Sequence, residues 1–221
     1  MIRAFKHTEP VELAASVTGS GPPLILLHGN GESRAIFDQL VPELVASFTV
    51  YSLDSRGHGE SPAAPLTYQA MADDVARFIR DHRLEHPALF GFSDGGIVGL
   101  LLAIQHPGLL SGLVVAGANL TPFGVSARCF MTTTWRFART RDPLARLMAG
   151  GPWISPSSLR EISVPTLVLA GERDLIRRSE TQRIARHIPD AELRIMPGEN
   201  HESYITHSPK LAPTLKQFLA A

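Results

Sequence analysis

One cysteine, Cys129, is all that the sequence contains, so no disulfide can form within the chain. Nothing in the composition asks for an oxidising compartment, and we therefore expect a cytoplasmic protein. Long apolar segments are missing as well, because the longest run, Ile97–Ile104, is far shorter than the roughly 20 residues that cross a bilayer. Met1–Pro10 carries charges but no apolar core of signal-peptide length. We predict neither a membrane segment nor a secretion signal.

Net charge is also missing, because 21 lysines and arginines balance 21 aspartates and glutamates. The chain as a whole has no field that would attract nucleic acid or a membrane surface. We expect a small-molecule substrate, no nucleic-acid partner and no membrane partner, while the oligomeric state stays open. The length of 221 residues suits one hydrophobic core with an insertion, so we predict a single domain over residues 1–221.

Short apolar runs bounded by glycine and proline alternate with longer segments of helical periodicity. This alternation is typical of an α/β fold with a mostly parallel, doubly wound sheet and helices on both faces. We predict buried strands at Pro23–Leu27, Phe48–Leu53, Ala88–Phe92, Leu113–Ala118, Thr166–Ala170 and Glu192–Met196, with an edge strand at Val11–Thr18. We predict helices at Ile36–Val45, Tyr68–Arg80, Gly96–Gln105, Ser179–His187 and Lys210–Leu219.

Residues 119–163 interrupt the alternation, because they show no strand pattern and their helical segments are broken by proline and glycine. We interpret them as a small helical lid, which is rich in arginine and aromatic residues. Phe130 and Trp135 are candidates for contact with an apolar substrate, and Arg128 or Arg136 could bind an acidic end of it. The alternative is that the arginines form a solvated face and the aromatic residues pack the lid onto the body.

A nucleophile motif lies between a predicted strand and a predicted helix. Residues Gly91–Gly95 read Gly-Phe-Ser-Asp-Gly and match the pattern G-x-S-x-G in the strand-turn-helix context that the motif requires. Two glycines leave room for the cramped turn that points Ser93 out of the sheet. The following helix N-terminus favours negative charge that develops beside Ser93. We predict that Ser93 is a nucleophile.

A serine hydroxyl needs a base within hydrogen-bond reach and an acid that orients the base. Asp174 follows the predicted strand Thr166–Ala170, and His201 follows the predicted strand Glu192–Met196. Loops at the carboxyl ends of parallel strands meet at one edge of an open sheet. We therefore predict that Asp174 is the acid and His201 the base.

Other carboxylates and histidines compete for these two roles. Asp54 precedes Ser93 and suits a turn that holds its own loop, and Asp190 lies before a strand rather than after one. Asn119 occupies another position where the acid could stand, and it carries no charge. Glu172 is therefore the second candidate for the acid, after Asp174. His28 and His58 are the strongest rivals for the base, although His28 ends a strand and would hold the adjacent loop.

Acyl transfer also needs hydrogen-bond donors for the oxyanion. The backbone N–H of Asp94, directly after the nucleophile, is one candidate. The second lies in the segment His28-Gly29-Asn30-Gly31, most plainly the backbone N–H of Asn30. Loss of one such donor costs on the order of 10²-fold in rate. No cluster of histidine and cysteine has metal-ligand spacing, and we predict no metal.

These segments together resemble the α/β-hydrolase superfamily across nearly the whole chain. The resemblance is carried by His28-Gly29, Asp54–Gly59, Gly91–Gly96, Gly171–Asp174 and His201. It implies the α/β-hydrolase fold, an acyl-enzyme mechanism on Ser93, Asp174 and His201, and no cofactor. A serine at position 93, where epoxide-opening and dehalogenating relatives carry aspartate, points to esters, thioesters, amides or activated C–C bonds.

A serine hydrolase that cleaves a small carboxylic ester is the leading hypothesis. C–C bond hydrolysis, thioester hydrolysis and cofactor-free perhydrolysis, as in bacterial-type non-haem haloperoxidases, use the same triad. A ligand receptor built on a hydrolase fold and without catalysis is the alternative from a different class. The insert, which must select the substrate, departs from many relatives in being short.

Overall fold

The computed structural model describes residues 9–219. Its strands are β1 (Ala15–Gly19), β2 (Pro23–Leu27), β3 (Thr49–Leu53), β4 (Ala88–Phe92), β5 (Gly112–Ala116), β6 (Thr166–Arg173) and β7 (Ala191–Asn200). Its α-helices are α1 (Val41–Leu44), α2 (Tyr68–Asp81), α3 (Asp94–Gln105), α4 (Ala127–Thr140), α5 (Pro143–Gly150), α6 (Arg178–His187) and α7 (Ala212–Leu219). Three 3₁₀ turns are η1 (Arg34–Phe37), η2 (Pro122–Gly124) and η3 (Ser158–Glu161).

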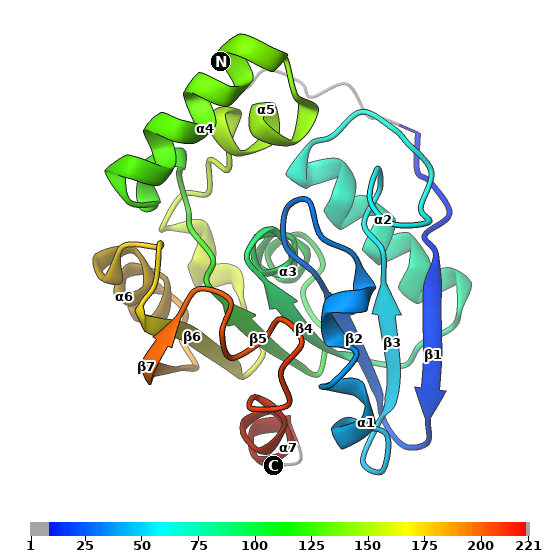
Figure 1. The fold of residues 1–221 in the computed structure, drawn as a ribbon. Coiled ribbons are helices and arrows are strands. Elements are labelled where there is room, and N and C mark those ends of the chain that lie inside the picture. Colours follow the sequence, from blue (N-terminus) through cyan, green and yellow to red (C-terminus); the bar gives the residue numbers. More distant parts are fainter. Residues whose placement is uncertain (1–8, 220–221) are drawn as a thin grey trace.

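The seven strands form one sheet in the order β1-β3-β2-β4-β5-β6-β7 (Figure 1). All neighbouring strands are parallel except β1, which pairs antiparallel with β3 at the edge. The predicted α/β class with a mostly parallel sheet and a polar edge strand is therefore confirmed. The loops that follow β2, β4, β6 and β7 leave the sheet at one edge because those strands run in the same direction.

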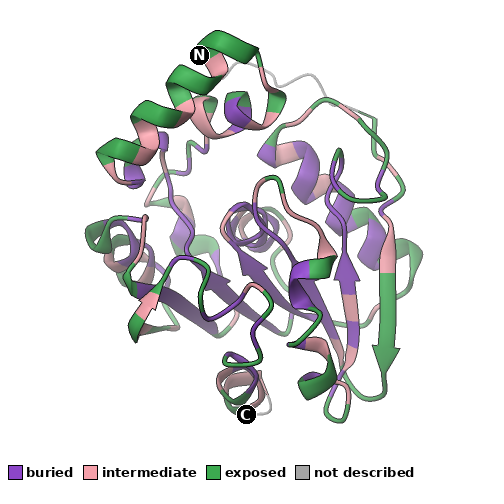
Figure 2. Ribbon diagram, viewed as in Figure 1, coloured by how far each residue is buried: buried purple, intermediate pink, exposed green. Residues whose placement is uncertain are grey.

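Helices cover both faces of the sheet and leave two apolar cores between the layers. Alternate residues of one strand serve different cores: Ile25 of β2 packs with α2 and α3, whereas Leu24 packs with α1 and α7. The central strands β4 and β5 are buried along their whole length (Figure 2). Burial on both faces explains why these strands read as continuous apolar runs rather than as alternating ones.

The predicted helix Ile36–Val45 is wrong, because the structure has η1 and the short α1 in its place. Pro42 is the physical reason. A continuous helix would require an N–H at Pro42 and would push its ring against the carbonyl of Asp38, whereas α1 accepts Pro42 in its first turn. Strands β6 and β7 also run further than predicted, through Arg173 and Asn200, which pair across the sheet.

The insert between β5 and β6 contains η2, α4, α5 and η3. Figure 1 shows α4 and α5 as a separate layer above the sheet, reached by the chain that leaves β5. No residue of α4 is buried, so this helix has little packing of its own against the body. Throughout residues 9–219, no helix combines the length and the apolar character needed to cross a membrane.

A buried ion pair links the loop after β3 to α2. The guanidinium of Arg56 is 0% exposed and the carboxylate of Asp74 is 1% exposed. Two bonds join them, from Nε at 2.5 Å and from a terminal nitrogen at 2.6 Å. Asp74 also accepts the backbone N–H of Val11, which secures the chain just before β1. Sequence reasoning did not pair these two residues.

We expect Asp74→Ala to lower the free energy of unfolding by about 3–5 kcal/mol, because it leaves the guanidinium of Arg56 buried without its carboxylate. Urea denaturation at neutral pH measures this loss. The control is Asp81→Ala, which breaks the exposed pair of Asp81 with Arg77 on the same helix and should cost less than about 1 kcal/mol. Equal losses in the two variants would contradict this account of the buried pair.

Candidate active site

Ser93 stands in a strained turn between β4 and α3. Its backbone φ is 52° and ψ is −115°, a conformation that residues with a side chain rarely adopt. The two neighbouring glycines are required by close backbone approach. A Cβ on Gly91 would lie 2.2 Å from the carbonyl oxygen of Gly95, and a Cβ on Gly95 would lie 2.3 Å from that of Leu27. The turn holds the Ser93 side chain at the sheet edge, where it is partly exposed.

The structure brings Ser93, Asp174 and His201 together although they are far apart in sequence. Nε2 of His201 lies 3.2 Å from the hydroxyl oxygen of Ser93. Nδ1 of His201 lies 2.6 Å from Oδ1 of Asp174. A carboxylate at Nδ1 fixes the tautomer in which Nε2 is free to accept the serine proton. The arrangement has the geometry of a nucleophile, a base and an acid that orients the base.

Asp174 is held by its own loop at the end of β6. Oδ1 accepts the backbone N–H of Ile176 at 2.9 Å, and Oδ2 accepts that of Gly171 at 3.0 Å. Burial by itself raises the pKa of Asp174, but the hydrogen bond from His201 and these two backbone bonds outweigh it and place the pKa below its ordinary value. Asp174 is therefore a carboxylate at neutral pH.

The two rival histidines hold the loop after β2. His28 accepts the backbone N–H of Ser55 at Nε2, and its Nδ1 lies 2.7 Å from the carbonyl of Gly29. His58 accepts the backbone N–H of Gly31 at Nε2, and its Nδ1 lies 2.9 Å from the carbonyl oxygen of Arg56. Each ring therefore accepts at one nitrogen and donates at the other, as a neutral imidazole does. Neither contacts Ser93.

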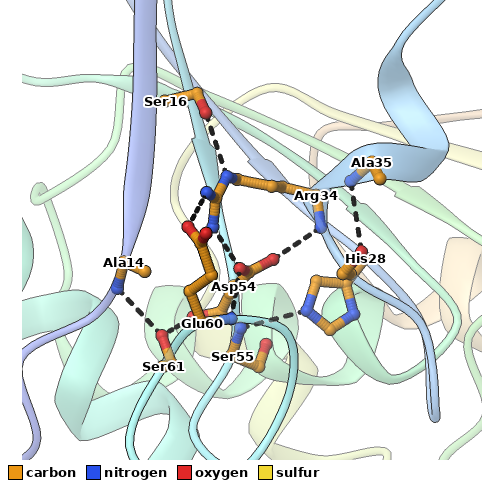
Figure 3. A network of polar contacts seen from close by, with 10 residues as sticks. Ala14, Ser16, His28, Arg34, Ala35, Asp54, Ser55, Glu60 and Ser61 are labelled. Carbon is orange, nitrogen blue, oxygen red and sulfur yellow. Dashed lines mark hydrogen bonds and ion pairs between the residues drawn. The ribbon is translucent and has the colours of Figure 1, made fainter.

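The rival acid Asp54 also serves loop structure, in the network shown in Figure 3. Its carboxylate accepts the backbone N–H groups of Arg34 at 2.7 Å and Glu60 at 2.9 Å, and it forms an ion pair with the Arg34 side chain. The prediction that Asp54 holds its own turn is confirmed. Arg34, Asp54 and Glu60 line a hollow of about 470 Å³ that includes none of Ser93, Asp174 and His201.

The two predicted oxyanion donors lie in segments that meet beside Ser93. Asp94 is the first residue of α3, and a first helical residue has an N–H for which the helix itself offers no acceptor. The loop that contains Asn30 approaches closely at Gly29, where a Cβ would lie 3.1 Å from the Cβ of Ser93. The side chains of the two residues are also joined, since Nδ2 of Asn30 donates to Oδ2 of Asp94 at 2.9 Å.

Sequence reasoning missed the role of the Asp94 side chain and the contribution of Tyr68. The hydroxyl of Tyr68, at the start of α2, donates to Oδ1 of Asp94 at 2.8 Å. Burial raises the pKa of Tyr68 well above its ordinary value, so this hydroxyl keeps its proton. The sequence did contain a signal for this role: Asp94 is a charged residue in the nucleophile motif, at a position that the strand-turn-helix context predicts to be buried.

Of the two predicted substrate contacts, the structure places one at the site. Phe130 lines the cavity beside Ser93, together with Tyr68 and Asp94. Trp135 does not, because it is 64% exposed and the guanidinium of Arg139 lies 5.0 Å from the centre of its ring. Five residues along an α-helix correspond to a rotation of about 140°, so the two side chains point from different faces of α4. The structure therefore places Trp135 away from this cavity.

Nor do the predicted arginines reach this cavity. Arg128 and Arg136 are exposed on α4, and Arg136 forms an ion pair with Asp142. Asn119 does line the cavity, while its amide donates to the carbonyl of Thr121. In the part of the chain that the structure describes, no group of three His, Cys, Asp or Glu side chains could hold a metal ion.

The buried His28 predicts a pH dependence of stability. Its folded-state pKa is lowered to about 4, mainly by burial, whereas an unfolded chain titrates at about 6.5. Between these values the unfolded state binds more protons, so the free energy of unfolding falls as the pH drops from 6.5 toward 4, by up to about 3 kcal/mol from this group.

Urea denaturation between pH 4 and pH 7 measures the effect. We expect the slope of unfolding free energy against pH to be shallower in His28→Gln than in the wild type, and unchanged in the exposed-site control His86→Gln. The same slope in all three proteins would show that His28 does not titrate as described.

The chain is similar to proteins that are named as esterases and lipases. A pimeloyl-[acyl-carrier protein] methyl ester esterase of Neisseria meningitidis is 29% identical over 88% of this chain and 92% of its own length. The sn-1-specific diacylglycerol lipase ABHD11 of Danio rerio is 33% identical over 56% of this chain and 40% of its own. The structure of a thermophilic esterase from Thermogutta terrifontis, 25% identical, superposes with a TM-score of 0.80 over 95% of this chain and 93% of that one.

Residues 22–146, more than half of the sequence, match the family described as alpha/beta hydrolase fold. The matched segment contains β2 to β5, the loop with Asn30 and the turn at Ser93. The fold, the strand order and the match all agree, and the chain belongs to the alpha/beta hydrolase family.

Proposed function

We propose that this protein cleaves a small carboxylic ester through an acyl-enzyme intermediate on Ser93, with His201 as the base and Asp174 as the acid that orients it. The observation that carries the proposal is the continuous chain of contacts from Asp174 through His201 to Ser93, at 2.6 Å and 3.2 Å. The same contacts support acyl transfer to water rather than a receptor role, because each atom needed for proton transfer is in place.

The chain is a hydrolase that acts on ester bonds. Its relatives in the alpha/beta hydrolase family include esterases, one of which matches over nearly its whole length. The relative from Neisseria meningitidis is named for cleavage of a methyl ester, and a small alcohol of this kind suits the narrow site described here. We take a short-chain alcohol ester as the working substrate.

In the first half-reaction, Nε2 of His201 takes the proton of Ser93 as its oxygen attacks the ester carbonyl carbon. The new oxyanion accepts hydrogen bonds from the backbone N–H groups of Asn30 and Asp94. His201 then gives its proton to the departing alcohol. In the second half-reaction, His201 activates a water molecule that attacks the acyl carbon, and the acid leaves as Ser93 regains its proton.

The space beside Ser93 limits the substrate. The cavity lined by Ser93, Asp94 and Phe130 measures about 20 Å³, which is room for a group the size of one water molecule. Tyr68 and Gly151 line both this cavity and a hollow of about 790 Å³ between the start of α2 and α5. The hollow supplies an approach for an apolar acyl chain, and the insert acts as a lid that shifts to admit it.

The remaining expectations stay part of the proposal. A small-molecule substrate, with neither nucleic acid nor a membrane as partner, is supported by the balanced charge of the sequence. A reducing, cytoplasmic location is supported by the single cysteine. No cofactor takes part in the proposed steps, since the chain itself provides the nucleophile, the base and the oxyanion donors.

The first test is covalent labelling with an uncharged fluorophosphonate, combined with hydrolysis of short-chain p-nitrophenyl esters. We expect the folded wild type to be labelled at Ser93 and to cleave the esters, and we expect Ser93→Ala to do neither. Ser47→Ala, which changes an exposed serine before β3, is the matched control and should behave as wild type. Absence of labelling in the folded wild type would refute the proposed function.

A second test separates orientation of the base from binding of the ester. Asp174→Asn preserves shape but no longer favours the tautomer of His201 that leaves Nε2 free, so we expect kcat to fall by about 10³- to 10⁴-fold with little change in KM. Steady-state kinetics measure both constants. Asp190→Asn, at the exposed start of β7, is the control and should retain wild-type kinetics. A change confined to KM would argue against Asp174 as the orienting acid.

A further inference from the structure

Asp94 carries a carboxylate that the proposed hydrolysis does not use. Only its backbone N–H serves the oxyanion, yet the residue is 3% exposed and its side chain is fixed at both oxygens. The donors are the hydroxyl of Tyr68 and the amide of Asn30, at 2.8 Å and 2.9 Å. Both donors are neutral, so they satisfy the hydrogen-bonding capacity of Asp94 without balancing its charge.

The charged groups around Asp94 do not balance it either. Burial raises the pKa of the Asp94 carboxyl above its ordinary value, although the hydrogen bonds from Asn30 and Tyr68 and the charge interactions with His58 and His201 act in the opposite direction. No lysine or arginine among residues 9–219 forms an ion pair with Asp94. His58 accepts the N–H of Gly31 at Nε2, and its Nδ1 faces the carbonyl oxygen of Arg56. His201 takes up the proton of Ser93 during the proposed reaction. A buried carboxylate without a cation is costly, and a positively charged group bound beside it would offset that cost.

The position of Asp94 indicates which ligand. Asp94 and Tyr68 line the cavity beside Ser93, whose other walls are neutral and include Asn119, Phe130 and Met148. About 20 Å³ accommodates one water-sized group, and an ammonium group is of this size. Neutral walls leave Asp94 as the only charged group among the residues that line this cavity.

We propose that Asp94 binds a positively charged amino group of the substrate, so that the enzyme prefers esters of amino acids to uncharged esters of the same shape. This inference rests on the proposed function, because it takes Ser93 as the nucleophile. It adds the substrate class, which neither the fold nor the relatives specify. Asp94 is then a binding residue, separate from the triad that carries out the chemistry.

The amino group belongs to the acyl part of the ester. The departing alcohol must lie beside His201, which protonates it, whereas the Asp94 side chain is directed to Tyr68 and Asn30. Asp94 directly follows Ser93, and consecutive Cα atoms are about 3.8 Å apart. A group bound by Asp94 is therefore close to the acyl carbon, which fits an amino group one or two carbons from the carbonyl.

Asp94 also removes an electrostatic penalty that such substrates would otherwise meet. His201 gains positive charge in the transition state, and an ammonium group a few ångströms away opposes that gain in a low-dielectric site. A carboxylate next to the ammonium cancels most of this repulsion. Loss of Asp94 removes this compensation, so the rate of an amino acid ester relative to its uncharged analogue falls.

The test compares phenylalanine methyl ester with methyl 3-phenylpropanoate, which differ only in the amino group. The full chain is assayed at pH 6.5, where the amine is protonated, and the released acid is quantified by chromatography. We expect kcat/KM of the wild type to favour the amino ester by about 10- to 100-fold, as a charge-assisted contact does. In Asp94→Asn this ratio should fall to one or below.

Asp94→Asn keeps the local hydrogen bonds, because the amide oxygen accepts from Asn30 and the amide nitrogen donates to the hydroxyl of Tyr68. Glu32→Gln is the matched control. Glu32 is a second carboxylate near His201, bonded to the N–H of Gly29, and its neutralisation should leave the ratio between the two esters at the wild-type value. A ratio that falls in Glu32→Gln and not in Asp94→Asn would overturn the assignment.

A second measurement needs no variant. The preference of the wild type should disappear as the pH rises above the pKa of the substrate amine, about 7.7–8.0 for an ordinary α-amino group. A wild type that labels at Ser93 and cleaves both esters equally at pH 6.5 would refute the inference and leave the proposed function intact. Absence of labelling and of hydrolysis would instead refute the proposed function.

Discussion

The strained turn at Ser93 is the constraint on which the rest of the site depends. A non-glycine residue at a φ of 52° costs about 1–3 kcal/mol and persists only where the surroundings fix it. Here the surroundings are β4, buried along its whole length, and backbone that approaches Gly91 and Gly95 too closely for a Cβ. Once the turn is fixed, the parallel strands β6 and β7 deliver Asp174 and His201 to the same edge of the sheet.

A second set of polar contacts holds the loops after β2 and β3, which lie near the turn at Ser93. His28 and His58 use backbone N–H groups and carbonyls to fasten the loops after β2 and β3, and the pair of Arg56 with Asp74 fastens the latter loop to α2. Burial lowers the pKa of His28, and Arg56 is paired with Asp74, so these three residues shape the site without adding net charge to it at neutral pH. Among residues 9–219, the carboxyl group of Asp94 is buried beside Ser93 and forms no ion pair.

The triad geometry and most of the fold followed from the sequence because they depend on short patterns. Apolar runs bounded by glycine and proline located the strands, and the loops after two of them contained Asp174 and His201. The prediction of one helix that includes Pro42 was wrong, because hydrophobic spacing does not take into account that proline lacks a backbone N–H. The sequence did not indicate that Trp135 points away from the cavity, because composition does not give the rotational phase of a helix. The contacts of Asp94 could not be predicted because they depend on Tyr68 and Asn30, which lie far away in the chain.

Although the sequence has no net charge, its positive and negative groups are distributed unevenly between the insert and the site at Ser93. The arginines of the insert are exposed, where salt screens them over about 8–10 Å, while the carboxylate of Asp94 is buried beside Ser93. A buried charge is screened far less than an exposed one, so a charge on Asp94 acts more strongly on a group in the cavity than the exposed arginines do. The arginines of the insert suggested an acidic end on the substrate, with a solvated arginine face as the alternative. The structure places these arginines on the exposed surface, whereas the carboxyl group buried beside Ser93 belongs to Asp94.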